Sequence, residues 1–145
     1  MLIATKDFGS ADVAESSVFT FPDGILGFTE YRRYVLLHSD EADDPMWYLQ
    51  CIDEPELRFI LLNPFAVFSW YDPDVSDDAL TRLEKSDADD MRIYAITNTS
   101  CEKIEDTTVN LRSPIIMNMN KRLAIQHVLE SPKFSMRQRI FGDEV

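Results

Sequence analysis

The sequence of 145 residues is short of the residue types that build catalytic, metal and nucleotide sites. It contains four glycines, two cysteines and two histidines. So few glycines leave no glycine-rich loop to hold a nucleotide phosphate, and two cysteines cannot form a disulfide framework. The histidines, His38 and His127, lie far apart in the chain, without the close spacing of a metal-binding pair. We therefore expect no catalytic residues, no metal and no cofactor.

Long apolar runs are absent as well. Runs such as Phe59 to Leu62 are far shorter than the ~20 residues of a membrane span. At the N-terminus, Lys6 and Asp7 interrupt the chain before the apolar core of a signal peptide could form. These features predict a soluble, cytoplasmic protein without a membrane partner. In that compartment we expect Cys51 to be an inert buried thiol, not bonded to Cys101.

Basic residues are scarce and unevenly placed. The chain has 14 of them against 26 acidic residues, a net charge of −12. Between Asp40 and Asp90 there are fifteen acidic and three basic residues, which account for the whole excess. Phosphate backbones would repel such a chain, so we expect no direct nucleic acid binding. Two interpretations of the acidic section stay open: solvated loops that keep the protein soluble, or a face for a basic partner.

One acidic segment, Asp72 to Asp78, is reminiscent of a calcium-binding loop. An EF-hand loop needs glycine at its sixth position and glutamate at its twelfth. Asp77 and Leu83 occupy those positions here, so the sequence argues against a calcium site.

Short alternating apolar segments separated by Asp- and Pro-rich turns predict an all-β fold, mainly antiparallel, either β-barrel-like or a sandwich. Only Ser76 to Lys85 has a helical pattern, with Ser76 as N-cap. We expect one domain over residues 1–145 with one short helix near residues 76–85 and a flexible tail from about 131 to 145. The expected strands are 2–5, 11–13, 18–21, 34–37, 46–52, 57–62, 65–71, 91–98, 107–111, 115–119 and 123–129.

Four strings, in order along residues 2–137, resemble motifs of the flagellar assembly factor FliW family. They are Phe19 to Glu30, Pro45 to Cys51, Phe59 to Pro64, and Asn110 to Asn118 followed by Gln126 and Leu129. Departures from the family pattern are Thr29 before Glu30, Ser113 for alanine, Cys51 for serine and Phe134 for tyrosine.

The resemblance implies a regulatory binding protein and no enzyme. FliW-like proteins bind the translational repressor CsrA and keep it from its mRNA targets, flagellin mRNA among them. They also bind new flagellin, and this exchange of partners couples flagellin translation to flagellar assembly. The proline-interrupted acidic clusters give no regular track that could imitate RNA phosphates, so we expect non-competitive antagonism.

The candidate partner-binding residues combine the motifs with the charge map: Phe28, Glu30, Gln50, Asp53, Glu54, Asn63, Asp72, Asp74, Asn110 and Asn118. For Phe28, Gln50 and Asn118 a purely structural role is the alternative, through packing or a hydrogen bond to a nearby loop. A small-ligand or flavin-binding β-barrel enzyme is the alternative function, and a structural subunit with a self-complementary apolar surface is a third.

Overall fold

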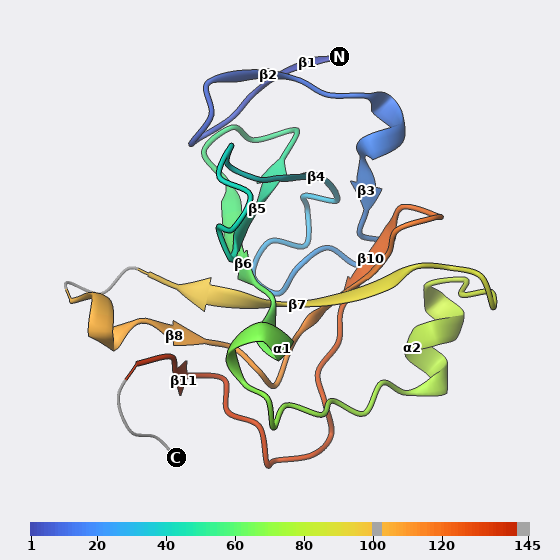
Figure 1. Cartoon of the computed structure of the whole chain (residues 1–145). Coiled ribbons are helices and arrows are strands. Elements are labelled where there is room, and N and C mark those ends of the chain that lie inside the picture. The colour runs from blue at the N-terminus through green and yellow to red at the C-terminus, as the bar shows by residue number, and fades with distance from the viewer. Residues whose placement is uncertain (100–102, 142–145) are drawn as a thin grey trace.

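The computed structural model describes residues 1–99 and 103–141 (Figure 1). Short strands dominate, with two short α-helices and two 3₁₀ turns among the described residues. In chain order the elements are β1 Leu2–Ala4, β2 Ser10–Asp12, η1 Glu15–Ser17, β3 Phe19–Thr20, β4 Arg33–Leu37, β5 Met46–Cys51, β6 Arg58–Leu62, α1 Pro64–Val67, α2 Asp77–Arg82, β7 Met91–Asn98, η2 Ile104–Asp106, β8 Thr108–Val109, β9 Ile115–Asn118, β10 Leu123–Gln126 and β11 Gln138–Arg139.

Seven of the strands close into a barrel. The order β7-β6-β5-β4-β3-β10-β9 returns to β7 because the first half of β7 pairs with β9 while its second half pairs with β6. All neighbours are antiparallel except β3 and β10, which pair in parallel at Thr20 and Leu123. Strands β8 and β11 extend the sheet from the end of β7. The expected mainly antiparallel, barrel-like all-β fold is confirmed.

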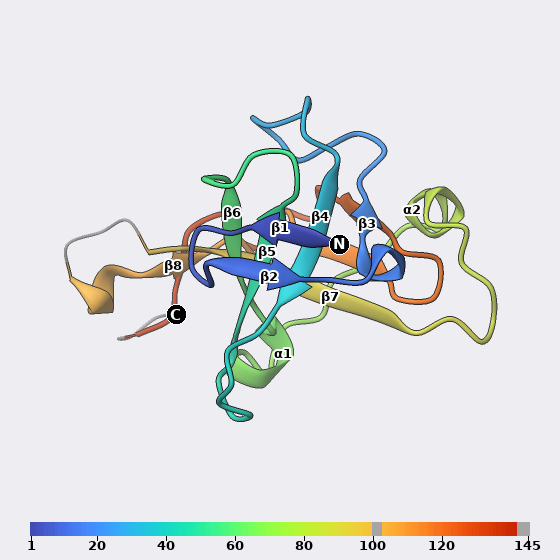
Figure 2. The same cartoon turned by 90° about the horizontal axis from the view of Figure 1, so that it is seen from above.

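The β1–β2 hairpin lies across one end of the barrel (Figures 1 and 2). Two contacts to the barrel hold its turn. The Lys6 amide donates to the Gln50 side chain at 3.0 Å, and Asp7 forms an ion pair with Arg58 at 2.7 Å. Since Gln50 is 1% exposed, the hairpin is anchored on a fixed point of the wall.

The barrel interior is filled by side chains that alternate along the strands. Phe19, Tyr34, Leu49, Leu61 and Met117 are each 0% exposed and belong to one cluster. A strand places every second side chain on the same face, so these residues converge on the barrel axis. A second cluster packs the C-terminal segment against β8, and a third packs α2 against β9 and β10.

The expected strand over Phe65 to Tyr71 is wrong. The chain instead forms α1 and a following turn in which the Tyr71 amide donates to Phe68 O at 3.0 Å. Asn63 caps the helix, because its Oδ1 accepts from the Phe65 amide at 3.0 Å, and Pro64 pre-sets the first helical position. The helix expected near residues 76–85 is present as α2, capped by Ser76 as predicted.

The described part of the C-terminal segment makes contacts with the barrel, and the flexibility expected for residues 131–145 stays a prediction. Phe134 is 3% exposed in the second cluster, and the Leu111 amide donates to Ser135 O at 2.9 Å. Strand β11 then pairs with β8. The segment from Ser131 to Phe141 therefore packs against the barrel. No helix within the described ranges is long and apolar enough to cross a membrane.

Candidate functional site: an acidic surface and its supports

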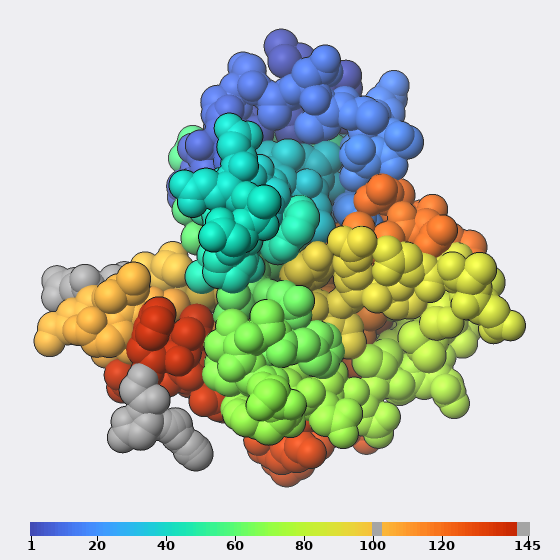
Figure 3. Space-filling model, in the orientation of Figure 1, coloured from blue at the N-terminus to red at the C-terminus, as the bar shows by residue number. Residues whose placement is uncertain are grey.

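The acidic section between Asp40 and Asp90 lies in the connections of the barrel. Its acids occupy the β4–β5 turn, the β5–β6 turn, the α1–α2 connection, the first turn of α2 and the α2–β7 connection. In Figure 3 the β4–β5 turn (cyan), the segment around α1 (green) and the segment from α2 to β7 (yellow-green to yellow) lie on the face turned towards the viewer. The β5–β6 turn, which carries Asp53, Glu54 and Glu56, lies beyond the other end of β5, so the acidic section is displayed on more than one side of the molecule (Figure 2).

Few of these fifteen carboxylates are neutralised within the chain. Three form ion pairs, Asp53 with Arg33, Asp89 with Lys121 and Asp90 with Arg92, at 2.5, 2.8 and 3.1 Å. The other twelve have no ion-pair partner in the part of the chain that the structure describes. Unpaired surface carboxylates produce a negative field that attracts a basic surface and repels RNA.

Asp72 and Asp74 border a hollow of about 540 Å³. Glu130 and Lys133 line the same hollow, with the ring of Phe134 as an apolar wall. His127 also faces it, and burial lowers the pKa of this imidazole, as does nearby Arg82. The Lys133 ammonium lies over the Phe134 ring, 5.0 Å from its centroid, so the hollow holds a cation of its own beside its three carboxylates.

Phe28, Glu30, Asp53 and Glu54 lie at one end of the barrel, on the β3–β4 and β5–β6 turns. The Phe28 ring is 38% exposed and contacts Phe59 edge-on, with the ring centroids 5.4 Å apart. Glu30 is exposed. Glu54 accepts from the Glu56 amide at 3.1 Å, and the hydrogen bond from Arg33 lowers the pKa of Asp53.

Gly24 fixes the shape of the first of these turns. It has a φ of 68°, and a Cβ at this position would lie 2.6 Å from the Cα of Thr29. A side chain there would therefore push the turn open.

Three amide side chains of the candidate set hold loops in place. Gln50 donates to Pro55 O and Leu57 O at 3.0 and 3.2 Å, which fixes the β5–β6 turn. Asn110 Oδ1 accepts from the Arg112 and Ser113 amides at 3.1 and 3.0 Å, and Asn63 caps α1 as described above. The structural alternative for Gln50 is observed, and partner contact by these residues stays a prediction.

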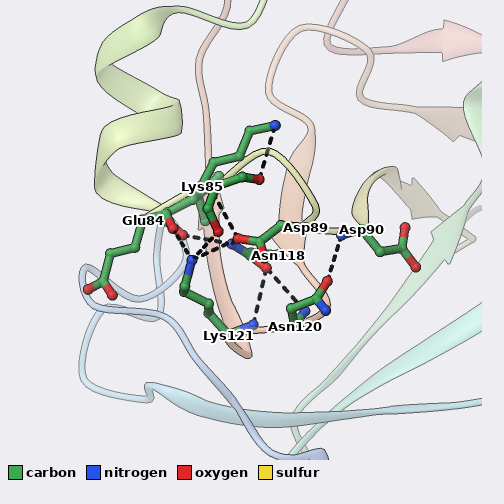
Figure 4. A network of polar contacts seen from close by, with 9 residues as sticks. Glu84, Lys85, Asp89, Asp90, Asn118, Asn120 and Lys121 are labelled. Atoms are coloured by element: carbon green, nitrogen blue, oxygen red, sulfur yellow. Dashed lines mark hydrogen bonds and ion pairs between the residues drawn. The ribbon is translucent and has the colours of Figure 1, made fainter.

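Asn118 is the centre of a buried polar network (Figure 4). Its Nδ2 donates to Leu83 O at 3.0 Å and to Asp89 Oδ2 at 2.9 Å. Its Oδ1 accepts from the Asn120 and Lys121 amides, both at 3.1 Å. Asn118, which is 0% exposed, thus joins the end of α2 to the β9–β10 turn. The hydrogen bond from Lys121, with those from the Ser86 amide and Asn118, lowers the pKa of Asp89 far below its usual range.

Arg122 takes the positive φ of the β9–β10 turn, at 55°. Asn118 supports the turn through its side chain, and the Arg122 guanidinium lies over the Phe19 ring, 4.8 Å from its centroid. That cation–π contact helps to hold arginine in a conformation that it otherwise avoids.

The ten candidate residues therefore do not form one pocket. Asp72 and Asp74 line one hollow, and the others occupy the turns at the barrel end, strand β5, the start of α1, the β8–β9 connection and strand β9. Sequence reasoning missed an apolar groove beside α1, because it assigned α1 to a strand. The Asn63-Pro64 pair, a helix start signal, could have revealed that helix.

The cysteine and metal expectations fall partly on described residues. Cys51 is a free thiol with 0% exposure, and burial raises its pKa. Cys101 lies outside the described residues, so the expectation for the pair remains untested. Within residues 1–99 and 103–141, no three His, Cys, Asp or Glu side chains gather as a metal site would require.

Comparison with known proteins places the chain in a family. Residues 2–140 match the family model described as FliW protein. The chain is 37% identical over 145 residues to the flagellar assembly factor FliW of Geobacillus sp. (strain WCH70), covering 100% of this chain and 99% of that protein. It is 34% identical over 140 residues to the factor of that name from Syntrophus aciditrophicus (strain SB), covering 97% and 87%.

The structural comparison agrees. A crystal structure of the flagellar assembly factor FliW superposes with a TM-score of 0.92 at 34% sequence identity, covering 100% of both chains. The motifs, the closed barrel and both comparisons span essentially the same residues. This chain belongs to the FliW family of flagellar assembly factors.

Proposed function

We propose that this protein is a non-enzymatic regulator that acts in the cytoplasm by binding CsrA and flagellin in exchange for one another. Bound to this protein, CsrA releases its mRNA targets, flagellin mRNA in particular. Newly made flagellin then binds this protein in place of CsrA, so that flagellin translation is coupled to flagellar assembly.

The observation that carries the proposal is the acidic surface with twelve carboxylates lacking an ion-pair partner among the described residues. A repressor that grips RNA must present basic edges to the phosphates. An acidic surface is complementary to those edges, speeds encounter with them and disfavours wrong partners. The filled interior of the barrel argues against the alternative, because buried side chains occupy the space that a flavin would need.

The arrangement of the acids favours non-competitive antagonism. They sit on separate turns that Pro45, Pro55, Pro64 and Pro73 interrupt, so they do not repeat at the regular spacing of successive phosphates. We expect this protein to bind beside the RNA groove of CsrA and to weaken RNA binding by coupling and by local repulsion. A ternary complex then forms at high RNA concentration.

The test measures association of the purified protein with purified CsrA and, separately, with purified flagellin, at rising salt concentration. We expect binding to both, and an association rate with CsrA that falls as salt screens the exposed charges. The double variant Asp72→Asn/Asp74→Asn should associate more slowly. The control Asp12→Asn/Glu15→Gln, which removes the same charge outside the acidic section, should behave as wild type. A rate that salt leaves unchanged contradicts the acidic-surface mechanism, and no binding to either protein contradicts the proposed function.

A further inference from the structure

An apolar groove of about 550 Å³ lies on the surface next to α1. Its walls come from the start of β5, the end of β6, α1, η2 and the chain after β11. In Figure 3 the cyan, green, orange and red parts of these segments meet on the face turned towards the viewer. The apolar lining that matters here is Met46, Leu62, Val67, Ile104, Ile140 and Phe141.

Several lining side chains are exposed to solvent. Ile104 is 74% exposed, Phe141 45% and Val67 37%. On the same helix as Val67, Phe65 is 46% exposed. Single exposed apolar residues are ordinary, but several of them around one groove mark a surface that another chain covers.

Acidic residues adjoin the lining of the groove in the sequence. Asp43 and Asp44 directly precede the lining residues Pro45 and Met46, and Glu105 and Asp106 directly follow Ile104. The basic residues beside the lining are Lys103 and Arg139, and Arg139 is engaged with Asp106 at 3.6 Å.

Asp44 stays charged next to this lining. The Met46 amide and the Ser39 hydroxyl donate to its carboxylate at 2.9 and 2.8 Å, and these bonds lower its pKa. An apolar floor with an excess of carboxylates next to its lining residues is complementary to an apolar face with basic flanks.

We propose that this groove docks an amphipathic segment of a partner protein, with large apolar side chains on one face and lysine or arginine at its flanks. The choice of a protein partner rests on the proposed function. A second copy of this chain fits poorly, because a symmetric contact would bring two sets of these carboxylates together in a protein of net charge −12.

The first arm of the test uses a labelled model peptide of about four helical turns, with leucine at i, i+3, i+4 and i+7 and lysine elsewhere. A second peptide carries glutamate in place of lysine. Fluorescence anisotropy should show that the lysine peptide binds the wild-type protein at least about tenfold more tightly than the glutamate peptide. Equal affinities for the two peptides would overturn the proposal.

Matched variants locate the binding. Ile104→Ser/Val67→Ser removes two apolar groups without changing charge, and both residues are exposed enough to leave the core intact. Leu26→Ser is the control, because Leu26 is 64% exposed on the β3–β4 turn, outside the groove. The groove variant should lose about tenfold in affinity for the lysine peptide, about 1.4 kcal/mol, while the control keeps it. If the groove variant and the control bind the lysine peptide equally well, the proposal is overturned. It is also overturned if wild type forms a dimer that only the groove substitutions dissociate, because the groove would then bind a second copy of this chain.

The second arm titrates CsrA and flagellin with the same three proteins. If wild type binds at least one of them and the groove variant binds it about tenfold more weakly, the groove is used by that partner. If wild type binds and the groove variant binds equally well, the groove proposal is wrong and the proposed function stands. If wild type binds neither, the proposed function fails, and the peptide arm still decides the groove.

Discussion

The substitution Asn118→Ala tests whether the polar network under the acidic surface holds the fold together. It deletes four hydrogen bonds from a residue with 0% exposure. The two turn amides can bond to water instead, so most of the loss comes from Leu83 O and the Asp89 carboxylate. At about 1 kcal/mol for a neutral bond and up to about 3 for a charged one, we expect a loss of about 2–4 kcal/mol.

Urea unfolding and thermal melts followed by circular dichroism measure this loss. For a chain of this size each kcal/mol lowers Tm by roughly 2–4 °C, so we expect a drop of about 4–16 °C. The control is Asn120→Ala, because Asn120 is exposed and accepts only the Asp90 amide. It should cost less than about 1 kcal/mol. Equal losses for the two variants, or a loss below about 1 kcal/mol for Asn118→Ala, would refute the reasoning.

Three further predictions concern two buried tyrosines, the Asp89 carboxylate and metal removal. Tyr34→Phe should leave Tm unchanged or raise it, because its buried hydroxyl has no hydrogen-bond partner among residues 1–99 and 103–141. Tyr71→Phe should cost about 1 kcal/mol, because it loses the 2.7 Å bond to Leu111 O, and melts of both variants check this. Because the pKa of Asp89 is lowered in the folded protein, its ionised carboxylate stabilises the fold fully above the usual carboxyl pKa near ~4. This stabilisation is lost on further acidification, so Asp89→Asn should make Tm fall less steeply at acid pH than in wild type. Extensive EDTA treatment should change neither Tm nor partner affinity, and a clear drop would reveal a bound metal.

Local patterns were enough to predict most of the barrel wall. Alternation located β4, β5, β6, β7 and β9 to within a residue or two at each end, and Ser76 with its following acids located α2. The segment from Phe65 to Tyr71 misled because its apolar and aromatic residues suit a strand, while the cap at Asn63 and the proline after it impose a helix. The closure of the barrel rests on the parallel pairing of β3 with β10, a contact between segments about a hundred residues apart, which no local pattern encodes.

The candidate site was harder to predict for a related reason. The sequence located the acids but could not tell that Gln50 and Asn118 are buried, because burial depends on which loops fold back over them. The apolar groove was missed since five separate segments build it, and each contributes only one or two side chains. Surfaces assembled from distant segments need the fold before they can be seen.

RNA binding by CsrA at saturation tests the central claim most directly. RNA is titrated against a fixed amount of CsrA in the presence of increasing amounts of this protein. We predict that the plateau of bound RNA falls as this protein is added, and that a ternary complex is detected at high RNA concentration. A plateau that excess RNA restores in full, with only a shift in apparent affinity, would mean simple competition, and a curve unaffected by this protein would contradict CsrA antagonism altogether.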